Sequence, residues 1–321
     1  MRQEIITLSS GAVLTAYIWE YSKEINLAKR PAVLVFPGGA YLACSDREAD
    51  VVALAYAAEG YHTFVLRYRT KRPFEEPFAD AREALALIRK NAEKWKVSAD
   101  KIAICGFSAG GHLAAAMGTI AEEKPNALLL GYPCVREEDW AIGSQIIPRV
   151  PGLLDKVSKE TPPCFLFAAC DDKVVPIQNS ISFMDSLNSC GISFECHIFR
   201  EGGHGFSVAK PYILSGEDTF INRTLSQWFP MSVDWLKGVF GKFETLDAAE
   251  DSDVSPALRI PIGEMVKNEK MKEVLDKYHI VSQQMLDMAG SMPLGAMLDF
   301  LGRSQEEIEA LLKELEEAFH V

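Results

Sequence analysis

The chain has no long hydrophobic run, no excess of basic residues and no closely paired cysteines. No stretch of its 321 residues approaches the roughly 18 apolar residues that a membrane-spanning helix needs, and residues 1–10 lack a basic start followed by an apolar run. We therefore expect no membrane partner and a cytoplasmic location. The formal charge of -12, from 33 basic and 45 acidic residues, argues against a nucleic-acid partner, because binding to phosphates relies on clustered Lys and Arg.

The seven cysteines are odd in number, and none belongs to a Cys-x-x-Cys pair. Most lie within apolar runs, as Cys105 and Cys164 do. This pattern is typical of reduced, buried thiols in a reducing compartment, and it lacks the ligand spacings of a structural zinc site. We expect no metal.

The first 200 residues alternate between apolar runs and amphipathic stretches. Runs rich in Val, Ile, Leu and Phe occur at 33–36, 63–68, 102–105, 127–131, 164–169 and 194–199, and helical patterns occur at 46–59, 77–95, 109–121 and 178–188. Strands that alternate with helices form a mostly parallel sheet covered on both faces. Residues 4–9 and 12–19 flank a Ser10–Gly11 turn and predict an antiparallel hairpin at one edge. We therefore predict an α/β fold with about eight strands.

The chain divides into two domains in this interpretation. Residues 1–243 form an α/β catalytic domain with lid-like insertions at 135–161 and 207–230, residues 244–257 form an acidic linker, and residues 258–321 form a small all-α module. The last segment contains a capping box, Ser304 with Glu307, followed by an apolar stripe. Residues 1–243 hold 26 basic and 28 acidic residues, whereas residues 244–321 hold 7 and 17. Most of the net charge therefore belongs to the C-terminal part, which is a candidate for homo-oligomer formation.

The sharpest motif is Gly106-Phe107-Ser108-Ala109-Gly110, which lies between a predicted strand and a predicted helix. A serine in such a tight turn needs strained backbone angles and small neighbours, and the turn raises its hydroxyl above the sheet. The helix start behind it favours negative charge. The motif therefore predicts a nucleophile at Ser108.

A nucleophilic serine needs a base and an acid that orients the base, and in this architecture they follow in the order Ser, acid, His. Asp171 and Asp172 follow the strand at 164–169, and His204 follows the strand at 194–199 between glycines. Either aspartate could orient His204 while the other caps the next helix. His112 is the other histidine near the serine, but it lies four positions along the same helix, so we interpret it as a packing residue.

Four segments together resemble the α/β-hydrolases of the acetyl esterase and acetyl xylan esterase kind, a branch related to hormone-sensitive lipase and to bifunctional xylan and feruloyl esterases. They are Phe36-Pro37-Gly38-Gly39-Ala40-Tyr41, Gly106-Phe107-Ser108-Ala109-Gly110-Gly111-His112-Leu113, Asp172-Lys173-Val174-Val175-Pro176 and Gly203-His204-Gly205-Phe206. The family places its acid four residues before the Pro of an Asp-x-x-Val-Pro turn. The resemblance therefore implies Asp172 as the acid, with Asp171 as the fallback.

The resemblance also implies an oxyanion hole. The family commonly has His-Gly-Gly-Gly after its first long strand, where backbone amides bind the oxyanion together with the amide that follows the nucleophile. Here the segment is Pro37-Gly38-Gly39-Ala40. The implied donors are the amides of Gly39, Ala40 and Ala109. An Ala fits this role if its backbone angles are ordinary.

These parts predict a serine esterase that works through an acyl-enzyme and needs no metal or organic cofactor. The resemblance implies short acyl groups, above all acetyl, on a carbohydrate such as an imported xylo-oligosaccharide. The alternatives are another acyl hydrolase on the same scaffold, such as an arylformamidase, feruloyl esterase, lipase or peptidase, and a noncatalytic binding protein. Four aromatic residues of the insertions are candidates either for a substrate pocket or for the core of a lid: Trp140, Tyr212, Phe220 and Trp228.

Overall fold

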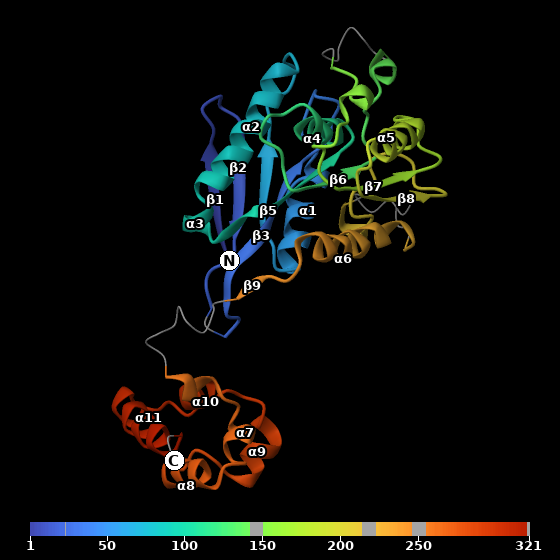
Figure 1. Ribbon diagram of the computed structural model, residues 1–321. Helices are drawn as coiled ribbons and strands as arrows, with labels where there is room; N and C mark the ends of the chain where they lie inside the picture. Colours follow the sequence, from blue (N-terminus) through green and yellow to red (C-terminus); the bar gives the residue numbers. More distant parts are fainter. Residues whose placement is uncertain (23, 142–149, 214–222, 246–254, 320–321) are drawn as a thin grey trace. The chain divides into compact units, whose positions relative to one another are not determined.

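The structure is a computed structural model that describes residues 1–22, 24–141, 150–213, 223–245 and 255–319 (Figure 1). The chain forms two compact units. The sheet unit comprises Met1–Tyr21 and Leu27–Thr245, and the helical unit comprises Ser22–Asn26 and Leu246–Val321. The division after Thr245 lies close to the boundary near residue 244 that the charge distribution indicates. Most of the predicted linker, residues 246–254, lies outside the described residues.

The sheet unit contains one mixed sheet. Its strands are β1 (Arg2–Thr7), β2 (Val13–Ile18), β3 (Leu27–Phe36), β4 (His62–Arg67), β5 (Val97–Phe107), β6 (Ala127–Gly131), β7 (Cys164–Ala169), β8 (Phe194–Phe199) and the short β9 (Glu244–Thr245). The order is β1-β2-β4-β3-β5-β6-β7-β8, with β9 paired to β3. The six strands from β4 to β8 in this order are mutually parallel, and β1 and β2 form the predicted antiparallel hairpin. The predicted α/β class is thus confirmed.

Helices cover both faces of this sheet (Figure 1). They are α1 (Asp50–Ala58), α2 (Glu75–Lys90), α3 (Ala92–Trp95), α4 (Ala109–Thr119), α5 (Gln178–Ser189) and α6 (Trp228–Phe240), with short 3-10 turns η1 (Asp46–Glu48), η2 (Glu137–Ala141), η3 (Leu154–Lys156), η4 (Pro211–Ile213) and η6 (Leu225–Gln227). Side chains on one face of the sheet pack with α2, α4 and α5, and those on the other face pack with α1 and α6.

Strand β3 shows why the central strands read as unbroken apolar runs. Leu34 and Phe36 belong to the core on one face, and Val33 and Val35 belong to the core on the other, all with no solvent exposure. A strand covered on both faces has no polar side to present to water. Because the strands β3, β5, β6, β7 and β8 are parallel neighbours, the loops after them meet at one edge of the sheet.

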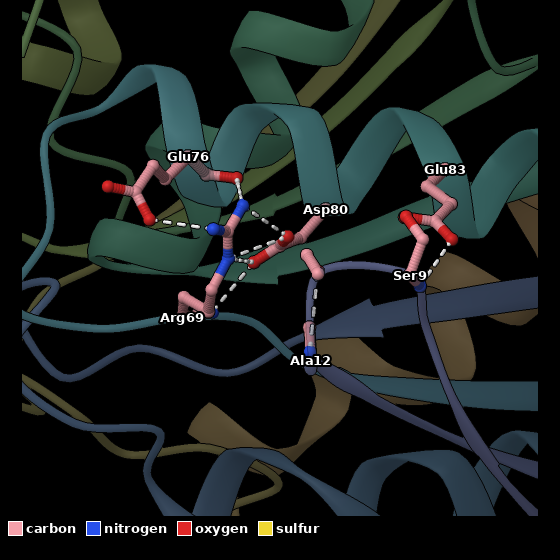
Figure 2. Close-up of polar contacts among 7 residues, drawn as sticks. Ser9, Ala12, Arg69, Glu76, Asp80 and Glu83 are labelled. Atoms are coloured by element: carbon pink, nitrogen blue, oxygen red, sulfur yellow. Dashed lines mark hydrogen bonds and ion pairs between the residues drawn. The ribbon is translucent and has the colours of Figure 1, made fainter.

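A polar clamp holds the loop between β4 and α2 at that edge (Figure 2). The Arg69 guanidinium donates to the Asp80 carboxylate and, at 2.7 Å, to Glu76, and the Arg69 amide donates to Asp80 at 2.9 Å. Asp80 is fully buried, so its charge depends on this partner. In the same loop the Tyr68 hydroxyl donates to the carbonyl of Pro37 at 2.7 Å. The clamp therefore also supports the loop that follows β3.

The helical unit contains α7 (Ile262–Met265), α8 (Glu269–Lys277), α9 (Gln283–Ala289), α10 (Leu294–Phe300), α11 (Gln305–Phe319) and the 3-10 turn η7 (Pro256–Arg259). The capping box at the start of α11 forms as predicted, since the Ser304 amide donates to Glu307 at 2.9 Å and the Glu307 amide donates to the Ser304 hydroxyl at 3.3 Å. Leu311 and Leu315 of α11 are buried in a core of this unit's own.

Candidate active site

The turn between β5 and α4 holds Ser108 in a strained conformation. Its φ of 53° and ψ of -117° lie in a region that L residues rarely adopt. A Cβ added to Gly106 would lie 2.1 Å from the carbonyl oxygen of Gly110, and one added to Gly110 would lie 2.1 Å from that of Phe36. Such strain costs roughly 1–3 kcal/mol, which the burial of one or two core side chains offsets at about 1.5–3 kcal/mol each. The predicted strained turn with obligatory small neighbours is confirmed.

The structure brings Ser108, Asp172 and His204 into one hydrogen-bonded row. His204 Nε2 lies 2.9 Å from Ser108 Oγ, and His204 Nδ1 lies 2.7 Å from Asp172 Oδ2. The other oxygen of Asp172 accepts the backbone amides of Val174 at 2.8 Å and Val175 at 2.9 Å. The Asp172 side chain is 1% exposed. Since a carboxylate that accepts two amides and faces Nδ1 favours a proton on that nitrogen, Nε2 is left to accept the serine proton.

The neighbouring aspartate has a different task. Asp171 Oδ1 accepts the amides of Gly202 and Gly203, each at 2.9 Å, and so fixes the backbone just before His204. Gly203 has a φ of 59°, which glycine adopts without the penalty of a side chain. Of the two aspartates that the sequence leaves open, it is Asp172 that faces the imidazole, whereas Asp171 holds the loop.

The loop after β3 approaches the serine at Gly38, where an added Cβ would lie 3.1 Å from the Cβ of Ser108. Within the described residues, the amides of Gly39 and Ala40 donate to no protein acceptor, and Ala109 is the first residue of α4. Gly39 has a φ of 127°, and a Cβ there would lie 2.3 Å from the carbonyl of Ala43. Ala40 has a φ of 55°, so it does not meet the condition of ordinary backbone angles that we set for an alanine in this role. The left-handed conformation explains why the family commonly has glycine at this position.

Glu48 is a candidate site residue that no sequence motif marks. It lies at the end of η1, in a stretch that the sequence predicts to be an amphipathic helix, where acidic residues of the first turn normally face solvent. The structure buries it to 3% exposure, with Gly38 and Tyr132 as hydrogen-bond partners. No local pattern marks this burial, because the partners lie 10 and 84 positions away.

His112 is fully buried, and its two ring nitrogens form hydrogen bonds with Tyr41 and Pro151. Its Nε2 donates to the carbonyl of Pro151 at 2.9 Å, and its Nδ1 accepts from the Tyr41 hydroxyl at 2.8 Å. Burial lowers the pKa of His112 to about 4. A neutral imidazole in this setting is a packing residue, as we interpreted it.

The aromatic residues of the insertions do not form one group in the described structure. Trp228 is fully buried, stacks on Phe167 at 4.0 Å and donates to the carbonyl of Ser207, so it belongs to the core. Tyr212 is 70% exposed. The Trp140 side chain, Phe220 and the parts of the two predicted lids at 142–149 and 214–222 lie outside the described residues.

The described residues offer neither a metal site nor a membrane-spanning helix. No three His, Cys, Asp or Glu side chains gather as a metal ion would require. None of the described helices is long and apolar enough to cross a membrane.

Family models match two parts of the sheet unit. The model named BD-FAE matches residues 21–139, and the model of the prolyl oligopeptidase family matches residues 152–227. Among characterised relatives, an acetylxylan esterase from Xylanibacter ruminicola is 28% identical over 196 residues, which cover 54% of this chain and 41% of that protein. The chain spans from 34% to 56% of the lengths of the curated relatives that it matches.

Two solved structures are similar over most of their length. An α/β hydrolase, MGS-M1, from a Medee basin deep-sea metagenome library is 38% identical with a TM-score of 0.69, and the match covers 75% of this chain and 99% of that one. An acetyl ester-xyloside bifunctional hydrolase from Caldicellulosiruptor lactoaceticus is 30% identical with a TM-score of 0.62, covering 72% of this chain and 89% of that one.

Proposed function

Because the chain belongs to the α/β-hydrolase family of esterases, we propose that it is a serine carboxylesterase that removes short acyl groups from a carbohydrate. The single observation that carries this proposal is the row Ser108, His204 and Asp172, joined at 2.9 Å and 2.7 Å. In the proposed activity, acetyl is the preferred acyl group and an acetylated xylo-oligosaccharide is the preferred substrate. The named activities of the acetylxylan esterase and of the acetyl ester-xyloside hydrolase support this choice.

In the proposed mechanism, Ser108 Oγ attacks the ester carbonyl while His204 Nε2 takes the hydroxyl proton. Asp172 keeps the imidazole in the required tautomer and stabilises the imidazolium that forms. The carbonyl oxygen becomes an oxyanion, which the amides of Ala109 and of Gly39 or Ala40 bind. The bond between the carbonyl carbon and the sugar oxygen then breaks, His204 gives its proton to that oxygen, and the sugar leaves as the alcohol while the acyl group remains on Ser108.

Deacylation repeats these steps with water. His204 takes a proton from the water, the resulting hydroxide attacks the acyl carbonyl, and the proton returns to Ser108 Oγ as the carboxylic acid leaves. The fold itself holds Ser108 and Ala40 in strained backbone conformations. Donors that are already oriented need no reorganisation when charge develops, so the strain supports the reaction rather than only burdening the fold.

Esters of p-nitrophenol with different acyl lengths test the proposal. We expect hydrolysis of the acetate to exceed that of the octanoate, and Ser108→Ala to lower kcat by about 10⁴-fold or more, because removal of the nucleophile disables the whole row. Equal rates for Ser108→Ala and the wild type would exclude the mechanism. A faster reaction with octanoate would instead favour a lipase.

The natural substrate needs a direct test. We expect the wild-type protein to release acetate from acetylated xylo-oligosaccharides. The Ser108→Ala variant should release none from the same substrate. Three other products would each point to a different acyl hydrolase if no acetate is released. They are ferulate from a feruloyl ester, formate from an arylformamide, and a peptide fragment from a peptide.

A further inference from the structure

Glu48 is a buried carboxylate that the proposed mechanism does not use. Among the described residues, the buried carboxylates are Glu48, Asp80 and Asp172. Asp172 faces His204, and Asp80 has Arg69 as its counter-ion (Figure 2). Glu48 forms no direct ion pair with a described basic side chain, and the positive charges that attract it, on Arg47 and on a protonated His204, are not in contact with it. Since burial of an unpaired charge costs several kcal/mol, its retention calls for a reason.

The hydrogen bonds of Glu48 are those of an ionised carboxylate. Oε2 accepts the amide of Gly38 at 2.9 Å, and Oε1 accepts the hydroxyl of Tyr132 at 2.6 Å. The Tyr132 oxygen in turn accepts the amide of Ser207 at 3.1 Å. If Glu48 carried a proton towards Tyr132, the buried tyrosine hydrogen would lose its acceptor, so the donor count favours the ionised form. Burial raises the pKa of Glu48, and the hydrogen bonds from Tyr132 and Gly38 oppose that rise.

These bonds join the two loops that frame the serine. The first loop, residues 37–43, contains Gly38, where an added Cβ would lie 3.1 Å from the Cβ of Ser108 and 2.5 Å from Oε2 of Glu48. Gly38 immediately precedes Gly39, one of the proposed oxyanion donors. The second loop, residues 200–209, contains Ser207, three positions after His204. A displacement of Glu48 would therefore shift both the loop with the proposed oxyanion donors and the loop with His204.

Tyr132 also brings the hydrogen-bonded network of Glu48, Tyr132 and Ser207, here called the Glu48 network, next to the imidazole of His204. Its ring centroid lies 5.0 Å from that of His204 in an edge-on arrangement. The Ser207 hydroxyl also donates to the carbonyl of Arg47, next to Glu48, and its own carbonyl accepts from Trp228 at 2.8 Å. Every polar group of the Glu48 network thus has a hydrogen-bond partner. A buried network that is fully satisfied in this way makes a site rigid.

We propose that Glu48 is a positioning residue of the esterase: it fixes the oxyanion loop through Gly38, fixes the histidine loop through Tyr132 and Ser207, and places a second negative charge near the His204 imidazolium. This proposal rests on the proposed function. A carboxylate suits the position because it accepts on both oxygens and carries no donor. The added charge stabilises the transition state, in which His204 is cationic, more than the ground state, in which it is neutral.

The substitution Glu48→Gln tests the proposal with little change in shape. The amide group must face either the Gly38 N-H or the Tyr132 O-H, so one donor meets another donor. We expect kcat for p-nitrophenyl acetate to fall about 10- to 100-fold, less than the 10²- to 10³-fold expected for loss of an oxyanion donor. KM should change little, because the Glu48 network does not touch the ground-state ester.

Tyr132→Phe, alone and combined with Glu48→Gln in a double variant, tests whether the Glu48 network acts as a unit. Tyr132→Phe removes one hydroxyl and leaves Glu48 in contact with Gly38, so we expect a smaller loss of kcat than for Glu48→Gln. The double variant should be no slower than Glu48→Gln alone. Multiplication of the two single effects would show that the residues act independently and would overturn the proposed connection.

Glu83→Gln is a matched control. Glu83 on α2 also accepts one backbone amide and one hydroxyl, both from Ser9 at 2.7 Å, at the β1 end of the sheet (Figure 2). The same substitution there removes a charge from equivalent donors but touches neither loop. We expect kcat of Glu83→Gln to equal that of the wild type.

Binding of phenylboronic acid separates positioning from loss of folding. Ser108 Oγ bonds to boron, His204 takes the hydroxyl proton, and a negatively charged tetrahedral boronate remains, which resembles the oxyanion. We expect Glu48→Gln and Tyr132→Phe to weaken boronate binding by the same factors by which they lower kcat. If kcat instead falls only in proportion to the folded fraction, measured by circular dichroism, Glu48 is merely structural.

The outcomes distinguish this proposal from the proposed function. Wild-type rates in Ser108→Ala would end both. An inactive Ser108→Ala together with a folded Glu48→Gln of unchanged kcat and unchanged boronate affinity would leave the esterase intact and overturn the role of Glu48. If Glu48→Gln does not fold, an unchanged boronate affinity in Tyr132→Phe has the same meaning.

Discussion

The sheet unit and the helical unit differ in what they bury. The sheet unit encloses polar and charged side chains, among them Glu48, Asp80, His112 and Asp172, whereas every buried side chain in the described parts of the helical unit is apolar. Positive φ angles of non-glycine residues follow the same division, because only Asn26 and His279 of the ten such described residues belong to the helical unit. Buried polar groups and strained backbone thus gather where side chains must meet for chemistry.

The helical unit is built from local rules instead. Asn268 and Ser282 cap α8 and α9 by accepting amides of the first turn, and Ser304 and Glu307 form the box before α11. The buried core consists of Leu, Ile and Met side chains together with Ala257. A unit of this kind is stabilised by its apolar stripe and its caps, and none of its described features resembles a reaction site.

Adjacent aspartates give the largest effect within the sheet unit. We expect Asp172→Asn to lower kcat by about 10⁴-fold, because the amide no longer selects the proper tautomer of His204. Asp171→Asn should remain close to the wild type, since its amide oxygen can still accept from Gly202 and Gly203. Rates with p-nitrophenyl acetate provide the measurement. A greater loss for Asp171→Asn would reverse our assignment of the two residues.

Equivalent core substitutions should separate the units. We expect Leu315→Ala in α11 to destabilise the helical unit by about 2–5 kcal/mol and to leave kcat unchanged. Leu34→Ala in β3 should cost the sheet unit a similar amount and lower the temperature at which activity is lost. Both leucines have no solvent exposure. Amide hydrogen exchange of α8 and α11, with enzyme kinetics, provides the measurement; a lower kcat in folded Leu315→Ala would contradict the division of roles.

Acid should weaken the sheet unit through its buried histidines. Burial lowers the pKa of His112 and of His62 to about 4, below the unfolded value of about 6.5. The unfolded chain therefore binds these protons more tightly, and stability falls as the pH drops from about 6.5 to about 4, by up to about 3 kcal/mol for each histidine. The raised pKa of Glu48 acts in the opposite direction and reduces the net slope.

Urea unfolding of the sheet unit at several pH values measures this slope, and His112→Gln should make it shallower. The helical unit buries no histidine in its described part, so exchange protection of its amides should depend less on pH over the same range. An unchanged slope in His112→Gln would show that this histidine does not couple protonation to folding.

The smallest effect should come from a helix cap. We expect Ser304→Ala to cost about 1 kcal/mol, because the two hydrogen bonds of the Ser304 hydroxyl with Glu307 are lost. Ser282→Ala, which removes the cap of α9, is the matched comparison. Exchange of the first-turn amides measures both effects. A change in esterase rate in either variant would connect the helical unit to the reaction.

Local patterns predicted much of the fold and the candidate site. The alternation of apolar runs with amphipathic stretches predicts β3 to β8 and the helices between them, because a buried parallel strand must be apolar on both faces. The motif around Ser108 predicts the strained turn because only small residues fit beside it. The capping box of Ser304 is likewise a contact over three positions, which sequence alone can encode.

The remaining features depend on contacts between distant parts of the chain. Sequence spacing alone leaves Asp171 and Asp172 equivalent, and only the position of His204, 32 residues later, separates them. The left-handed φ of Ala40 runs against the usual preference of alanine and is held by the surrounding fold.

The sequence by itself determined that Ser108, the aspartate pair and His204 are the candidate site residues and that they follow one another in this order. It also determined the helical character of the C-terminal part. Only the tertiary structure decided which carboxylates are buried and what they hold. Glu48 lies 84 positions before Tyr132, which is 75 positions before Ser207. Such a row has no period or motif, because its members meet only after the parallel strands have brought their loops to one edge of the sheet.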